Sequence, residues 1–281
     1  MDEQDNMSPD QSPMDALYRA IRQSQTLRGI YRDVYGVECP DIDHQTSFIT
    51  RSELSLLAQE LSIGEGDRLL DLGCGAGGPG LWVAKQTGAS VTGVDTSPVA
   101  VEVARHAAVE RGMGPHAQYL VADMANTGLP ARSFAGAVSI DALQVLPDPR
   151  KGLEEALRLL RPGARLAFTT WQTRAPQSVP EARRARFVED YRTVLEGYGL
   201  NVLHHIVPAG WRAQQLAIAD GVLRQQAVLR AELGDTACAL LVEEAQQEAE
   251  WLGATDAKRV LVVAEAPQGA DVSVDGLRKR S

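Results

Sequence analysis

"LLDLGCGAGGPG", residues 69–80, is the stretch that decides the fold of this chain. Its GCGAGG core fits G-x-G-x-x-G, the glycine turn that carries a helix N-terminus up to a dinucleotide pyrophosphate. Asp71 stands two residues before the first glycine, at the end of the expected strand. A carboxylate there repels a pyrophosphate but attracts a ligand that has an ammonium and a sulfonium group. We therefore expect a cationic nucleoside, for which the glycines leave backbone clearance.

Outward from this stretch, strands and helices alternate, which predicts an α/β fold with a mostly parallel sheet and helices on both faces. Later strands are expected in "LNVLHHIVPAGW" (200–211) and "KRVLVVAEAP" (258–267). The sheet is then seven-stranded and Rossmann-like. The other expected strands are 68–72, 90–95, 117–122, 135–140 and 164–171, with helices near 79–87, 97–111 and 149–160.

Before residue 64 the sequence predicts an N-terminal helical cap. Ser12-Pro13 is a typical helix start, and Gly36 ends the apolar face that follows. Thr50 and Glu53 have the spacing of a capping box, which begins a second helix.

The chain after the fifth strand predicts added helices. "EARRARFVEDYRTVLEGYG" (181–199) is expected to be one helix, and an Ala/Leu/Gln/Glu-rich stretch (211–253) forms a helical insertion before the last strand, broken near Gly234. The insertion suits either a lid or a dimer contact. The domain organisation expected is a loose tail at 1–12, the cap at 13–63, the α/β domain at 64–266 and a loose tail at 267–281.

Two more carboxylates follow expected strands. Asp95 ends the strand in "VTGVDTSP" (91–98), about twenty residues after the glycines, which suits hydrogen bonds to both ribose hydroxyls. Asp123 follows the third strand, where it can accept a hydrogen bond from an adenine amine while Met124 packs on the ring. Three acidic residues at one sheet edge favour a cationic nucleoside over a doubly negative dinucleotide.

Together these segments resemble the class I S-adenosylmethionine-dependent methyltransferases, strongly over residues 64–171 and weakly over the last strands. The resemblance implies an enzyme that uses S-adenosyl-L-methionine and releases S-adenosyl-L-homocysteine. The matching stretches are 69–80 (first motif), 91–98 (second strand), "VADMANTGLP" at 121–130 (adenine), "SFAGAVSIDALQVLPDP" at 133–149 and "LRLLRPGARLAFTTW" at 157–171.

By position, the resemblance implies a cofactor site along the carboxyl ends of the first four strands. Asp141, at the end of the fourth strand, is expected to face the methionine end or the acceptor. The cofactor-binding residues that it implies are Asp71, Gly73, Cys74, Gly75, Gly77, Asp95, Thr96, Asp123, Met124 and Asp141.

Missing motifs set several subclasses aside. Enzymes that methylate side-chain amide or exocyclic nitrogens resemble one another in an Asn/Asp-Pro-Pro-aromatic turn after the fourth strand, where this chain has "SIDALQ". Enzymes that methylate cytosine C5 use a cysteine that follows a proline, and none of the three cysteines here does so. "TTWQ" replaces the Asp-Asn of the metal-dependent catechol type, so no metal is expected. What remains is O-, N- or C-methylation of a small molecule, of the ubiquinone/menaquinone or secondary-metabolite kind.

The acceptor pocket is expected between the cap and the sheet. Tyr31 and Phe48 in the cap and Trp171 at the end of the fifth strand suit an apolar or planar acceptor, and ordinary packing between cap and sheet is the alternative.

Four residues are candidates for a catalytic base, if the acceptor must lose a proton. They are His44 in the cap, His204 or His205 on a late strand, and Asp141. Because neighbouring residues of a strand point to opposite faces, we expect at most one of the two late histidines to face the pocket.

Composition limits the partners. The 281 residues have a formal net charge of -9 and no basic run, which disfavours nucleic acid. No apolar run is long enough to span a bilayer, and the polar, acidic start differs from a signal peptide. We expect a cytoplasmic enzyme that acts on a small molecule, without a membrane partner, as a monomer or a homodimer.

Two other functions use the same residues. A protein that binds S-adenosylmethionine without methylating, as a cyclase or a regulator, would have the same anchors. A nicotinamide oxidoreductase is disfavoured by Asp71.

Overall fold

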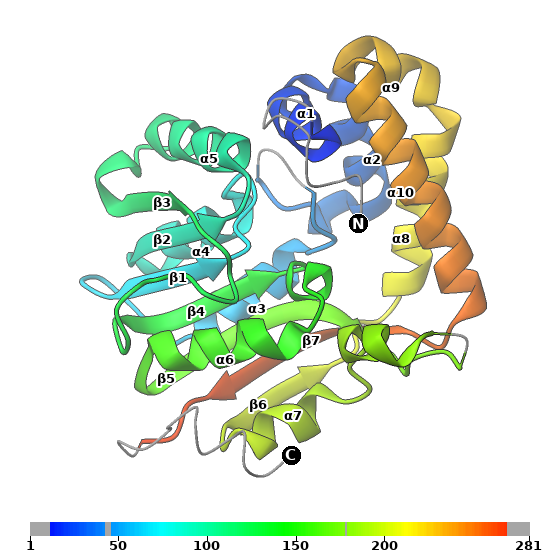
Figure 1. Ribbon diagram of the computed structural model, residues 1–281. Helices are drawn as coiled ribbons and strands as arrows, with labels where there is room; N and C mark the ends of the chain where they lie inside the picture. Colours follow the sequence, from blue (N-terminus) through cyan, green and yellow to red (C-terminus); the bar gives the residue numbers. More distant parts are fainter. Residues whose placement is uncertain (1–11, 43–45, 178, 269–281) are drawn as a thin grey trace.

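The computed structural model describes residues 12–42, 46–177 and 179–268. It contains a seven-stranded sheet of order β3-β2-β1-β4-β5-β7-β6 (Figure 1). The pairs from β3 through β5 are parallel, and β7 is antiparallel to both of its neighbours, so the predicted fold class is confirmed. The strands are β1 (Arg68–Leu72), β2 (Ser90–Asp95), β3 (Ala117–Val121), β4 (Phe134–Ile140), β5 (Leu160–Gln172), β6 (Asn201–Ile206) and β7 (Lys258–Glu265).

Helices cover both faces of this sheet because its strands carry apolar side chains on both sides. Leu70 of β1 packs in a core with helices on one face, and its neighbour Leu69 packs in a second core on the other. The first face is covered by α6 (Pro149–Leu159) and α7 (Tyr191–Gly197); the second by α3 (Arg51–Glu60), α4 (Gly78–Thr87) and α5 (Pro98–Glu110).

Five further helices form a layer beyond the carboxyl ends of the parallel strands (Figure 1). Their apolar faces share a third core, which the N-terminal helices and the insertion build together. None of the described helices combines the length and apolarity that crossing a bilayer requires. The helical layer comprises α1 (Pro13–Ala20), α2 (Gln25–Tyr35), α8 (Trp211–Arg224), α9 (Gln226–Leu233) and α10 (Asp235–Ala254).

Several helix predictions need correction. The helix expected from Ser12 to Gly36 is divided, since Ser24 takes an extended conformation and its side chain accepts a hydrogen bond from the Leu27 amide to cap α2. The helix expected at 181–199 is likewise a 3-10 helix (Glu181–Arg186) followed by α7, which Asp190 caps. The predicted capping box that begins α3 is present, but α3 packs on the sheet rather than with the other cap helices.

Candidate cofactor and acceptor cleft

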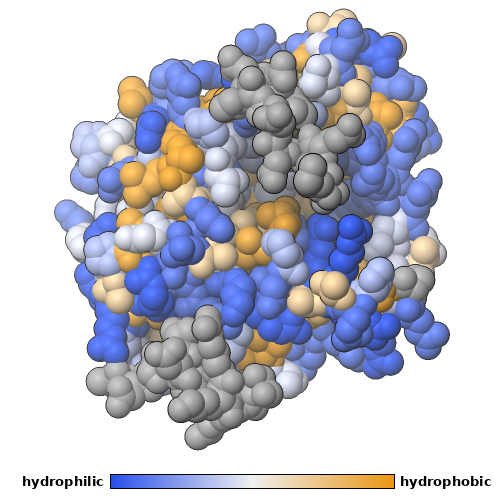
Figure 2. Space-filling view, in the orientation of Figure 1, coloured by the Kyte–Doolittle hydropathy of each residue, from blue (hydrophilic) through white to orange (hydrophobic). Residues whose placement is uncertain are grey.

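A cleft of about 1260 Å³ lies between the carboxyl ends of the central strands and the helical layer. The strand order reverses between β1 and β4, and in open α/β sheets such a reversal opens a crevice for ligands. Figure 2 shows apolar side chains in the middle of this face, between the two layers, with hydrophilic ones around them. A pocket for one small ligand has a volume of roughly 300–1,000 Å³, so this cleft has room for a cofactor and an acceptor together.

The glycine loop joins β1 to α4 at one side of the cleft. Gly73, Gly75 and Gly77 have φ values of 70°, 49° and 82°, a region that side chains other than glycine rarely adopt. Gly73 and Gly75 line the cleft. Gly77 does not line it, contrary to the expectation of cofactor contact: a Cβ there would lie 2.9 Å from Tyr119 Oη and 2.9 Å from Ala104 Cβ. Gly77 thus serves the packing of the turn.

Asp71, at the end of β1, lines the cleft with only 2% of its surface exposed. Its Oδ2 atom is buried and has no hydrogen-bond partner among the described residues. Burial, and then the nearby Asp95, raise the pKa of Asp71 to about 7, while the Gly80 amide favours the charged form. A buried carboxylate without a partner is costly, and the ammonium of S-adenosylmethionine would supply the missing donor.

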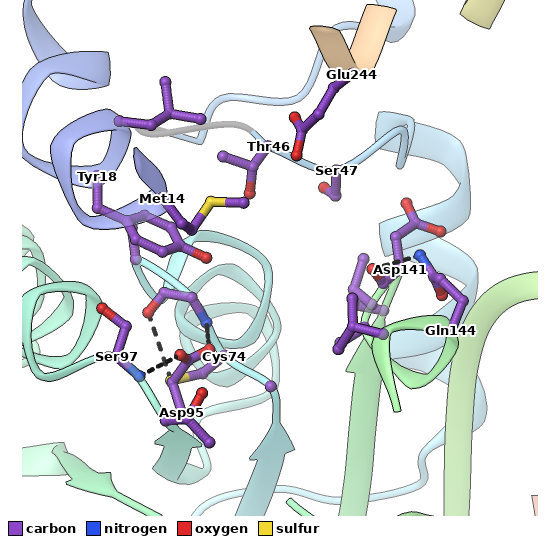
Figure 3. A pocket seen from close by; sticks show the side chains of 18 of the residues that line it. Met14, Tyr18, Thr46, Ser47, Cys74, Asp95, Ser97, Asp141, Gln144 and Glu244 are labelled. Atoms are coloured by element: carbon purple, nitrogen blue, oxygen red, sulfur yellow. Dashed lines mark hydrogen bonds between the residues drawn. The ribbon is translucent and has the colours of Figure 1, made fainter. Parts of the chain in front are cut away.

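Asp95, at the end of β2, shapes the loop that it faces (Figure 3). Its Oδ2 accepts a hydrogen bond from the Gly75 amide at 2.8 Å, and its Oδ1 accepts one from the Ser97 amide at 2.9 Å. Thr96 is exposed and also lines the cleft. The carboxylate therefore joins the two loops and keeps lone pairs free for a ribose hydroxyl.

The two residues expected to contact the adenine follow β3. Asp123 is exposed there, and its Oδ1 accepts a hydrogen bond from the Ala125 amide at 2.8 Å. Met124 is buried and lines the cleft beside Gly73. Cys74 lines the same region, and burial raises the pKa of its thiol, which makes it unreactive.

Aromatic side chains gather at the other end of the cleft, where the helical layer meets β5. Tyr31, Phe48 and Trp171 all line the cleft, as the sequence predicts for an acceptor pocket. The Trp171 ring centroid lies 6.4 Å from that of Phe48, 5.3 Å from Trp211 and 5.0 Å from Trp251, each in an edge-to-face arrangement. Such pairs hold the rings rigidly, so this end is a preformed apolar wall.

Asp141 follows β4 and lines the cleft with a left-handed φ of 50°. The guanidinium of Arg259, on β7, donates to both of its oxygens, at 3.2 and 3.3 Å. Asp141 Oδ2 also accepts a hydrogen bond from the Phe48 amide at 2.9 Å. Arg259 is 1% exposed and donates to Glu53 at 2.7 Å as well. With both oxygens engaged, Asp141 holds the loop of Phe48 against β7 and is poorly suited to be a base.

Neither of the late histidines lines the cleft, although the sequence made both of them candidate bases and predicted that at most one would face the pocket. Both rings are engaged on β6: His204 Nε2 lies 3.2 Å from a Glu60 carboxylate oxygen, and His205 Nε2 lies 2.9 Å from Gln172 Oε1. β6 is the edge strand, separated by β7 from the central strands. His44, the remaining histidine candidate, lies outside the described residues.

Other residues that line the cleft were not predicted as part of the site, among them Tyr18 on α1, and Glu244, Glu248 and Trp251 on α10. Figure 3 shows Tyr18 near Asp95 on one side and Glu244 reaching toward the pocket from above. The one sequence feature that could have indicated a role for α10 in the cleft is that its acidic residues lie on more than one face of the helix. Within the described part of the chain, no three His, Cys, Asp or Glu side chains are grouped as metal ligands.

Known proteins agree with this geometry. Residues 70–168 match the family model described as "Methyltransferase domain". The chain is 30% identical to the methyltransferase GfsG of Streptomyces halstedii over 159 residues, which are 52% of this chain and 57% of that protein. It is 36% identical to 27-O-demethylrifamycin SV methyltransferase of Amycolatopsis mediterranei over 112 residues, 40% of this chain and 41% of that one. The chain thus spans about half the length of these curated relatives.

Among solved structures, the [4+2]-cyclase SpnF has a TM-score of 0.66 with 23% identity, covering 90% of this chain and 97% of its own, a likeness of fold. The buried Asp71, with one oxygen unpaired among the described residues, the glycine loop and the matched domain agree on one cofactor, S-adenosylmethionine. Residues 70–168 therefore form a methyltransferase domain, and in this part the chain is similar to the class I S-adenosylmethionine-dependent methyltransferases.

Proposed function

We propose that this protein transfers the methyl group of S-adenosylmethionine to a small molecule that binds against the aromatic wall. The observation that carries the proposal is the buried Oδ2 atom of Asp71, which has no hydrogen-bond partner among the described residues, in a carboxylate placed at one end of a cleft large enough for two ligands. The sulfonium of the cofactor supplies an activated methyl group. A net charge of -9 makes a nucleic acid an unfavourable acceptor.

Each residue then has a distinct task. Asp71 binds the ammonium group, Asp95 the ribose, and Asp123 with Met124 the adenine. Asp141 holds Phe48 through its amide, so that the acceptor is positioned opposite the methyl group. Holding two reactants in attacking geometry can supply roughly 7–11 kcal/mol of the barrier. Positioning is therefore the main contribution of this chain.

We further infer that the helical insertion is a lid and not a dimer contact. The buried faces of α8 and α10 pack on α1 and α2 of the same chain in the third core. At the edge of the cleft, Asp15 of α1 accepts a hydrogen bond from Ser97. A lid of this kind excludes water from the reacting groups.

Calorimetric titration of S-adenosylhomocysteine tests the cofactor site. Asp71→Asn removes a charge-assisted hydrogen bond worth about 1.5–3 kcal/mol, so we expect affinity to fall about 10- to 100-fold. Asp220→Asn, on the exposed side of α8, is the control and should change affinity less than twofold. Binding of NADH without binding of S-adenosylhomocysteine would contradict the proposal.

Methyl transfer is tested separately, with methyl-labelled S-adenosylmethionine and a panel of phenols, alcohols and amines. We expect label in one acceptor and an equal amount of S-adenosylhomocysteine. Cofactor binding without labelled product across the panel would favour the second candidate, a cyclase that uses the bound cation, because a protein of the same fold is a [4+2]-cyclase.

A further inference from the structure

Helix α10 turns one charged and aromatic face toward the cleft. Leu241, Glu244, Glu248 and Trp251 follow one another at intervals of three and four residues, and all four line the cleft. Glu250, on another side of the same helix, is exposed and does not line it. The acidic residues of α10 are thus divided between solvent and the acceptor end of the cleft.

Glu248 lies in this face without a partner. Its Oε1 atom is buried, and no described residue hydrogen-bonds to it. Burial, and then the charges of Asp141 and Glu244, raise its pKa to about 8. Tyr31, on α2, also lines the cleft, and burial followed by the charges of Glu248 and Asp141 raises the pKa of its hydroxyl. A bound cation or hydrogen-bond donor would therefore stabilise the ionised form of the Glu248 carboxyl group.

The charges of the other lining residues also favour a cationic ligand. Among the described lining residues there are seven carboxylates but one basic side chain, Arg186. Asp71, Asp95 and Asp123 lie at the end of the cleft that we assign to the cofactor. The guanidinium of Arg259 donates hydrogen bonds to Asp141 and balances its charge. Glu248, which is half-buried, and the more exposed Glu244 are paired with no basic side chain among the described lining residues. S-adenosylmethionine has too little positive charge to balance both ends.

We propose that the acceptor carries a basic nitrogen and that Glu248 binds it, an inference that rests on the proposed function and names its substrate class. The rings of Tyr31, Phe48 and Trp251 enclose the same end of the cleft and suit a cation beside a planar or apolar body. Glu244, one turn earlier on α10, adds a second negative charge at the entrance.

The test compares three probes of one shape that differ in charge: 2-phenylethylamine, 2-phenylethanol and 3-phenylpropionate. Each is titrated calorimetrically at pH 7 into the full chain, with and without saturating S-adenosylhomocysteine. We expect the amine to bind at least tenfold more tightly than the alcohol, and the carboxylate most weakly, since a charge-assisted hydrogen bond is worth about tenfold or more.

Two variants test whether Glu248 causes the preference for the amine over the alcohol. Glu248→Gln should reduce the amine-to-alcohol ratio to below threefold, whereas Glu250→Gln, the matched control on the outer face, should leave it unchanged. Glu248→Gln should fold at least as well as the parent chain, because it removes a buried acid without a partner. In addition, amine binding by the parent chain should release protons at pH 7, and by Glu248→Gln should not, as measured in buffers of different ionisation enthalpy.

Equal affinity for amine and alcohol in the parent chain, or a preference that survives Glu248→Gln, would overturn the inference. Failure of S-adenosylhomocysteine to bind would instead contradict the proposed function. The titrations without S-adenosylhomocysteine still report the amine preference in that case, so the two failures are distinguishable.

Discussion

Arg259 holds two carboxylates from distant parts of the chain, and Arg259→Met tests how much the acceptor wall depends on it. The guanidinium side chain is 1% exposed, and those of Asp141 and Glu53 are 5% and 11% exposed. Methionine fills similar space without charge, so the variant leaves both carboxylates buried and unpaired.

The expected cost follows from this burial. Removing one partner of a buried ion pair costs about 3–5 kcal/mol, and because Arg259 serves two partners we expect the upper half of that range. An increment of about 4 kcal/mol is a large part of the roughly 5–15 kcal/mol that a folded domain has. The midpoint of thermal unfolding should fall by on the order of 8 °C, at about 2 °C per kcal/mol for a chain of this size.

Urea unfolding followed by circular dichroism measures the change in unfolding free energy, with an unchanged m-value as the check that the same transition is compared. Arg174→Met is the matched control, since Arg174 pairs with Glu189 while 75% of its own side chain is exposed. Such a pair contributes about 0–1 kcal/mol. A loss below about 1 kcal/mol in Arg259→Met, or equal losses in both variants, would refute the reasoning.

Two further predictions concern the cofactor end of the cleft. Gly77→Ala should destabilise more than Gly210→Ala by about 1–2 kcal/mol in urea unfolding. Both glycines are in the left-handed helical conformation, with φ and ψ of 82° and 0° at Gly77 and of 74° and -4° at Gly210, but only a Cβ at Gly77 would meet Tyr119 and Ala104. Equal losses would contradict this. The raised pKa of Asp71, about 7, means that the folded chain retains a proton that the unfolded chain loses near pH 4. The stability due to this group should therefore fall as pH rises from about 4 to 7, and Asp71→Asn should flatten that slope. The affinity for S-adenosylhomocysteine should rise from pH 6 to pH 8, since the ammonium favours ionised Asp71; a pH-independent affinity would contradict this assignment.

The cofactor end was predictable because its information is local. Asp71 and the glycines lie within one strand-to-helix turn, and Asp95 ends the next strand in the chain. In a parallel sheet, consecutive βα units bring such strand ends to one edge whatever the details of packing. The burial of Asp71 and the hidden place of Gly77 still required the structure, since both depend on how α4 and α5 pack.

The acceptor end was only partly predictable. Tyr31, Phe48 and Trp171 were expected there from the general position of cap and sheet. His204 and His205 were candidate bases, of which at most one was expected to face the pocket, and neither lines the cleft because the strand that carries them lies at the edge of the sheet. Glu248 was missed, since an acidic residue on a helix is normally solvated and only packing decides which face is covered.

The sequence alone determined the alternating α/β architecture, the cofactor and the strand ends that meet it, because each depends on periodicity or on residues within one turn. The tertiary structure decided which residues line the end of the cleft that we propose for the acceptor. Arg259 meets Asp141 across 118 residues and Glu53 across 206, and α10 reaches the cleft only by packing on α1 and α8. Contacts at such separations arise from how surfaces fit together in the folded chain, which no local pattern specifies.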